Sequence, residues 1–115
     1  MSLYLCVFAG DREVDGVEIG PYGNFNALRE AVVRELEDGI PGSRFPTFIL
    51  HSDCAGEWPA AAGTALGAEL AAIAAALPRR EDGERFVDVD GEPLLARLQA
   101  LVAAAREHRA PILFQ

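Results

Sequence analysis

The first twenty residues have the alternation of two neighbouring strands. Residues 3–9 are apolar on both alternating faces, a pattern typical of a central strand that is buried on both sides. Gly10 and Asp11 then signal a turn, and apolar residues alternate with acidic ones over 14–19. We interpret this second segment as a half-exposed hairpin partner of the first strand, with an acidic outer face.

Helical spacing of apolar residues follows in two longer segments. The first begins after a Gly- and Pro-containing loop, where Asn24 or Asn26 is the predicted N-cap, and it ends near Gly39. The second begins at Pro59 and ends before Pro78, since proline is tolerated in the first turn of a helix and stops one elsewhere. Its predicted buried face carries Leu66, Leu70, Ile73 and Leu77.

Short apolar segments over 45–50, 86–90 and 112–115 are predicted as the remaining strands. A third helix separates the last two, with Asp90 as its predicted N-cap and Pro111 after its end. The predicted order is therefore β-β-α-β-α-β-α-β. A charged turn over 79–84 precedes the strand at 86–90.

These elements predict an α+β fold, in which a mixed β-sheet packs against about three helices in one domain over residues 1–115. Such a two-layer arrangement leaves one sheet face, or a sheet edge, available to a partner. A small doubly wound α/β sheet is the alternative fold.

Composition narrows the classes of partner. The chain has 115 residues, with 18 Asp and Glu against 10 Arg and no Lys, so its formal net charge is −8. This charge disfavours nucleic acid and anionic membranes as partners. No signal peptide or membrane span is predicted, and two cysteines, Cys6 and Cys54, do not form a disulfide framework. We therefore expect a cytoplasmic protein.

The loop over 51–58 concentrates the reactive residue types of the chain. The spacing of His51 and Cys54 matches no thiol-catalysis signature, so the simpler interpretation is that Asp53 bonds loop amides and Cys54 packs as a small apolar residue. Trp58 next to Glu57 is either a lid over the core or the aromatic anchor of an interface.

A metal site is a second interpretation of the polar residues. Asp88 and Asp90 lie on the same side of the strand predicted at 86–90, and with His51 and Asp53 they supply oxygen and nitrogen ligands. The simpler interpretation makes Asp90 a helix cap and Asp88 part of a solvated strand face. No phosphate-binding loop or zinc motif is present in the sequence, so no cofactor is expected.

Several segments, in their order and spacing, resemble the immunity protein 70 family of bacterial polymorphic toxin systems. They are LYLCVF over 3–8, DGVEIG over 15–20, GSRFPT over 42–47, ILHSDC over 49–54, GEW over 56–58, DVDGEPLL over 88–95 and PILFQ over 111–115. The resemblance implies a small cytoplasmic α+β protein that binds and blocks a protein toxin, without catalysis. The family has a longer insertion where this chain has residues 77–85, so a toxin contact made by that insertion is not carried over.

The leading hypothesis is thus an inhibitor whose acidic surface meets a basic toxin. Asp53, Glu57 and Trp58 are the predicted central contacts, and His51 and Asp88 are further predicted partner-binding residues. One alternative is a small metal-dependent hydrolase that uses His51, Asp53, Asp88 and Asp90. Another is a homo-oligomeric structural protein, in the simplest case a homodimer, that pairs through its free sheet face or edge.

Overall fold

The chain opens with the predicted hairpin. The computed structural model describes residues 2–77 and 86–115. Strand β1 (Ser2–Ala9) pairs antiparallel with β2 (Arg12–Pro21), and helix α1 (Tyr22–Leu36) follows β2 directly. Two β-bulges in the pairing place an extra β2 residue at Val14 and at Ile19, so β1 keeps its regular alternation.

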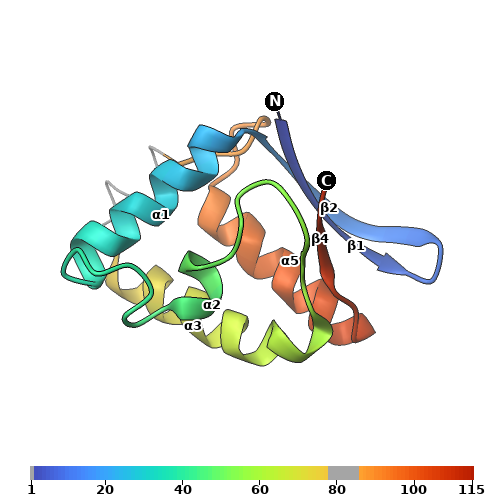
Figure 1. The fold of residues 1–115 in the computed structure, drawn as a ribbon. Coiled ribbons are helices and arrows are strands. Elements are labelled where there is room, and N and C mark those ends of the chain that lie inside the picture. The colour runs from blue at the N-terminus through green and yellow to red at the C-terminus, as the bar shows by residue number, and fades with distance from the viewer. Residues whose placement is uncertain (1, 78–85) are drawn as a thin grey trace.

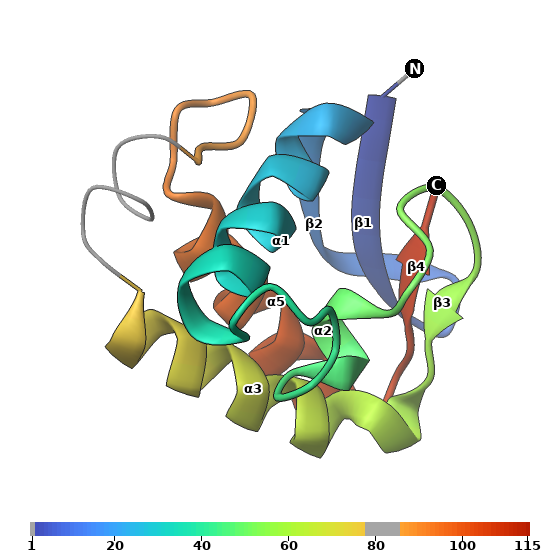
Figure 2. The ribbon, with the colours of Figure 1, turned by 60° about the vertical axis from the view of Figure 1, so that its left-hand side comes forward.

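The four strands form one antiparallel sheet in the order β2-β1-β4-β3. The C-terminal strand β4 (Ile112–Phe114) lies against β1, and the two-residue strand β3 (Glu57–Trp58) lies on the outer side of β4 (Figure 2). This confirms the central position predicted for the first strand. The doubly wound alternative, which requires a parallel sheet, is wrong.

The helices form the second layer. Helix α3 (Gly63–Ala76) follows a short 3-10 turn, η1 (Ala60–Ala62), and helix α5 (Leu94–His108) precedes β4. Figure 1 shows α1, α3 and α5 on the same side of the sheet, with the short helix α2 (Pro46–Ile49) between α1 and α3. The α+β class is therefore confirmed. Among the described residues, no helix has the length and apolarity needed to cross a membrane.

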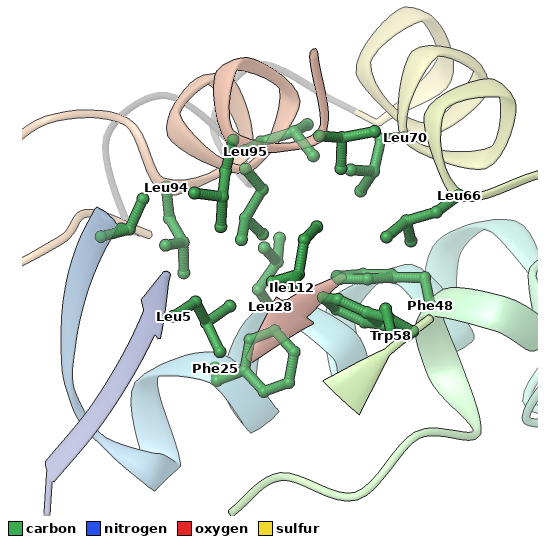
Figure 3. Packing of buried hydrophobic residues seen from close by; sticks show 14 of the residues in the cluster. Leu5, Phe25, Leu28, Phe48, Trp58, Leu66, Leu70, Leu94, Leu95 and Ile112 are labelled. Carbon is green, nitrogen blue, oxygen red and sulfur yellow. The ribbon is translucent and has the colours of Figure 1, made fainter. Parts of the chain in front are cut away.

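The hydrophobic core lies between the sheet and this helical layer (Figure 3). The predicted face of the second long helix is confirmed, because Leu66, Leu70, Ile73 and Leu77 are all buried. The sheet contributes its inward positions, and the largest fully buried side chains are Phe25, Phe48, Leu3, Leu5, Ile19, Leu28, Leu66, Leu70, Ile73, Leu94, Leu98 and Leu101.

The strand predicted over 45–50 is wrong, because this segment forms helix α2. Pro46 occupies the first turn of α2, where its missing N–H costs nothing. The carboxylate of Glu69 on α3 accepts hydrogen bonds from the backbone N–H groups of Thr47 (3.3 Å) and Phe48 (2.9 Å). This distant carboxylate satisfies the N–H groups that a helix start leaves unpaired.

The strand predicted over 86–90 is also wrong. This segment makes only an isolated bridge between Val87 and Pro93, and its turn is closed by the side chain of Asp88. Helix α5 has Pro93 rather than Asp90 at its N-cap. Likewise α1 begins at Tyr22, with Pro21 as its N-cap in place of an asparagine. The charged turn predicted over 79–84 lies outside the described residues.

Candidate partner-binding site

The loop over 51–58 is held to the helical layer by Arg29 of α1. Its guanidinium donates hydrogen bonds to the backbone carbonyls of Phe48 (3.2 Å), Ile49 (3.2 Å) and His51 (2.7 Å), where α2 ends. It also lies 4.5 Å from the centre of the Phe25 ring. Burial lowers the pKa of Arg29, while the charge of Asp53 opposes this change. Arg29 therefore caps α2 and fixes the start of the loop.

Asp53 ties the middle of the loop to the start of α1. Its carboxylate accepts a hydrogen bond of 2.7 Å from the side-chain amide of Asn26. This bond is the largest cause that lowers the pKa of Asp53, followed by a bond from Cys54. The exposed thiol of Cys54 lies 3.7 Å from the hydroxyl of Ser52, within the loop itself.

His51 and Trp58 pack the end of the loop onto β4. The His51 ring stacks on Phe114 at 4.3 Å, and its two nitrogens lie 2.8 Å from the carbonyls of Ser52 and Glu57. The indole N–H of Trp58 donates to the carbonyl of Thr47 at 2.9 Å, and the side chain is only 3 % exposed. Both rings thus position β3 against the sheet.

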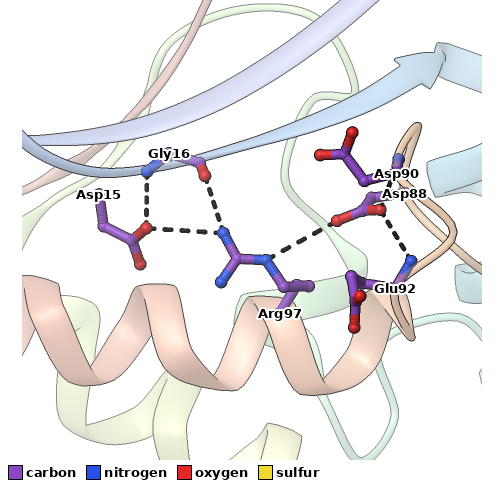
Figure 4. A network of polar contacts seen from close by, with 6 residues as sticks. All are labelled: Asp15, Gly16, Asp88, Asp90, Glu92 and Arg97. Atoms are coloured by element: carbon purple, nitrogen blue, oxygen red, sulfur yellow. Dashed lines mark hydrogen bonds and ion pairs between the residues drawn. The ribbon is translucent and has the colours of Figure 1, made fainter.

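Asp88 belongs to a different region, at the outer edge of β2 (Figure 4). Its carboxylate accepts hydrogen bonds from the backbone N–H groups of Asp90 (2.9 Å) and Glu92 (3.0 Å). Arg97 of α5 lies 3.7 Å from the same carboxylate and 3.6 Å from that of Asp15. The side chain of Asp88 is buried, so it orders the turn before α5.

The metal-site interpretation is not supported by these positions. Within residues 2–77 and 86–115, no group of three His, Cys, Asp or Glu side chains is placed to hold one metal ion. Asp53 bonds α1, whereas Asp88 closes the turn before α5. The site proposed from His51, Asp53, Asp88 and Asp90 is therefore wrong.

Comparison with protein families agrees with the resemblance seen in the sequence. A family model described as Immunity protein 70 matches residues 3–82, which include both strands of the hairpin and helices α1, α2 and α3. The chain belongs to the immunity protein 70 family. No curated protein and no solved structure matches it.

In this immunity protein 70 fold, the five predicted partner-binding residues do not form one exposed cluster. Glu57 is exposed on β3, and Asp53 is half-buried at the surface of the loop. Trp58 and Asp88 are buried, and His51 is half-buried against the sheet. Their role in binding a partner stays a prediction, with Glu57 and Asp53 as the two carboxylates at the surface.

The sequence interpretation missed a set of residues on the side of the sheet away from the helices. The strand register places them together, because Tyr4 is opposite Glu18, Phe8 is opposite Glu13, and Leu113 is opposite Glu57. On this side of β1 Cys6 is buried while Tyr4 and Phe8 are half-buried, so the predicted burial on both sides is confirmed only at Cys6. We call this surface the open face: Tyr4, Phe8 and Leu113 at its centre, and Glu13, Glu18 and Glu57 at its rim.

A surface hollow of about 460 Å³ lies elsewhere, between α1 and the segment that leads to α2. Arg29, Glu30, Val33, Pro41 and Ile49 are among its lining residues. Ile40 and Leu50, which neighbour lining residues in the chain, are 62 % and 64 % exposed. The hollow has both signs of charge in its lining, so its charge alone does not favour a basic partner.

Proposed function

We propose that this chain is a cytoplasmic immunity protein of a bacterial polymorphic toxin system, which binds a protein toxin and blocks its activity through an acidic surface. The observation that carries the proposal is membership of the immunity protein 70 family over most of the chain. The net charge of −8 supports a basic partner, because complementary charge speeds association and disfavours wrong partners.

The position of the exposed carboxylates supports binding rather than catalysis. Glu57 is exposed on β3, and the carboxylate of the half-buried Asp53 is fixed by its hydrogen bond from Asn26. Both are placed to pair with Arg or Lys of a partner. Trp58 and His51 contribute by holding the backbone that carries Glu57, and Asp88 contributes by ordering the turn before α5.

Inhibition of the toxin encoded next to this chain tests the proposal. The purified toxin domain is assayed alone and with an equimolar amount of the chain, and the mixture is analysed by gel filtration. We expect loss of toxin activity and a complex that contains both proteins. A toxin that stays fully active, with the two proteins eluting separately, would refute the proposal.

The homo-oligomeric alternative is less well supported, because both sheet edges are blocked. On β2, Arg97 donates to the carbonyl of Gly16 (2.9 Å), and the N–H of Val89 donates to the carbonyl of Glu18 (3.1 Å). At the other edge, β3 has only two residues. Short or covered edges do not extend a sheet into a second copy.

A further inference from the structure

The centre of the open face is apolar, and none of the described helices covers it. Tyr4 and Phe8 of β1 and Leu113 of β4 are half-buried, although α1, α3 and α5 lie on the opposite side of the sheet (Figure 1). Cys6 lies between them at 1 % exposure, opposite both Gly16 and Leu113. A contiguous apolar surface with a polar rim is typical of a protein interface.

The rim of this face carries charge of one sign. Glu13 and Glu18 lie on β2 and Glu57 on β3, so acidic side chains border the apolar centre at both edges of the sheet. With neighbouring strands about 4.8 Å apart, the two edges are separated by roughly 14 Å. Among the described strand residues, Arg12 is the one arginine, and it lies at the start of β2.

The rim carboxylates of β2 are held in place. The hydroxyl of Ser2 donates to Glu18 at 2.7 Å, and the hydroxyl of Tyr4 donates to Glu13 at 2.9 Å. The hydroxyl end of the Tyr4 ring lies over Gly16, where a Cβ atom would clash with the tyrosine oxygen. Within the described residues each of these carboxylates keeps one oxygen without a hydrogen bond, which a cationic partner can use.

A second copy of the chain fits this face poorly. A symmetric dimer places the same patch on both subunits, so glutamates would face glutamates across the interface. Like charges in apposition cost several kcal/mol, whereas guanidinium groups can both pair with the rim and stack on Tyr4 and Phe8.

We infer that the open face is the surface that binds the toxin, and that its occupant is a cationic protein surface. Arg or Lys side chains of this partner reach Glu13, Glu18 and Glu57. Apolar atoms of the partner cover Tyr4, Phe8 and Leu113. The inference rests on the proposed function and adds the surface and the chemistry of the partner to it.

Two matched sets of charge reversals test the inference. The face set is Glu13→Lys, Glu18→Lys and Glu57→Lys in one chain, and the control set is Glu30→Lys, Glu35→Lys and Glu107→Lys on α1 and α5. Both sets change the net charge from −8 to −2. Dissociation constants for the purified toxin domain encoded next to this chain are measured by calorimetry, after circular dichroism has established that each variant is folded.

We expect the face set to weaken binding about 100-fold and the control set to change it less than about threefold. A third set, with Gln at the three face positions, keeps the shape and is expected to weaken binding about tenfold. Equal affinities of the face and control sets would overturn the inference while the proposed function stands. Loss of binding in the control set alone would place the contact on the helical surface that carries these residues on α1 and α5, and would overturn the inference too.

Two further outcomes are distinguishable. If the wild-type chain neither binds nor inhibits the toxin, the proposed function fails and the inference fails with it. If light scattering shows a wild-type dimer that the face set converts to a monomer, a second copy occupies the open face and the inference is overturned.

Discussion

Replacement of Glu37 by Ala is expected to destabilise the fold more than any change to an exposed acid. Glu37 follows α1 and is only 2 % exposed, although it carries a carboxylate. The carboxylate accepts hydrogen bonds from three backbone N–H groups of the following turn: Gly42 (3.0 Å), Arg44 (2.9 Å) and Phe45 (2.9 Å). This turn leads directly into α2, so Glu37 fixes where α2 begins.

The size of this destabilisation depends on how exposed the three backbone N–H groups are. The N–H of Phe45 is buried, and leaving it without an acceptor costs about 1–3 kcal/mol. The N–H groups of Gly42 and Arg44 are closer to solvent, so water replaces part of each bond and the cost is about 0.5–1 kcal/mol apiece. We expect Glu37→Ala to lower the free energy of unfolding by about 2–5 kcal/mol. For a chain of this length, that lowers Tm by about 8–20 °C.

Urea unfolding followed by circular dichroism measures this loss, with Glu35→Ala as the control. Glu35 is the exposed acid two positions earlier, and its replacement is expected to change stability by less than about 0.5 kcal/mol. Glu37→Gln is expected to lower the free energy of unfolding about half as much as Glu37→Ala. Gln keeps one acceptor oxygen, but its NH2 group replaces the other oxygen and cannot accept a hydrogen bond from the backbone N–H there. If Glu37→Ala is no more destabilising than Glu35→Ala, the carboxylate does not hold the turn and the reasoning is wrong.

Three further predictions concern the sheet and its supports. Burial and then the hydrogen bond to Glu13 raise the pKa of Tyr4 to about 12, so the stability from its neutral phenol is fully present below about pH 10 and is lost as pH rises through about 12. Glu13→Gln should lower the midpoint of this titration at 295 nm, and an unchanged midpoint would contradict it. Asp88→Ala should lower the free energy of unfolding by about 2–3 kcal/mol in urea, because the backbone N–H groups of Asp90 and Glu92 lose their acceptor. Asp90→Ala is the control and should lower it by less than about 0.5 kcal/mol. Similar losses for the two variants would show that the buried Asp88 carboxylate does not stabilise this turn. Trp58→Phe removes the indole N–H and also part of a ring that is only 3 % exposed, so it should cost at least about 1–2 kcal/mol in urea unfolding; an unchanged stability would contradict both contributions.

Elements whose burial follows their own residue pattern could be predicted from the sequence. The second strand of the hairpin and the long helices are of this kind, because alternation or helical spacing alone decides which side of each is buried. The segment over 45–50 is different. Its N–H groups are satisfied by Glu69, 21 or 22 positions away, and its carbonyls by Arg29, about 20 positions away. No local pattern carries this information, so the apolar run by itself predicts a strand.

The candidate site was predictable in part for a similar reason. The polar residues over 51–56 correctly predict a loop placed by rigid elements, whereas Glu57 and Trp58, predicted as part of the same loop, form strand β3. The open face was missed because Tyr4, Cys6 and Phe8 are as apolar as the residues that alternate with them. Only the strand register, which joins β1 to β2 and β4, shows that glutamates border them.

The loop and the open face are physically connected through β3. The bond from Trp58 to Thr47 and the stacking of His51 on Phe114 fix β3 beside β4, and this register puts Glu57 opposite Leu113. A register shift by one residue would turn Glu57 toward the core and Trp58 outward. Substitutions that loosen the loop should therefore weaken toxin binding even where the replaced side chain touches no partner, because they displace the one acidic group on that edge of the open face.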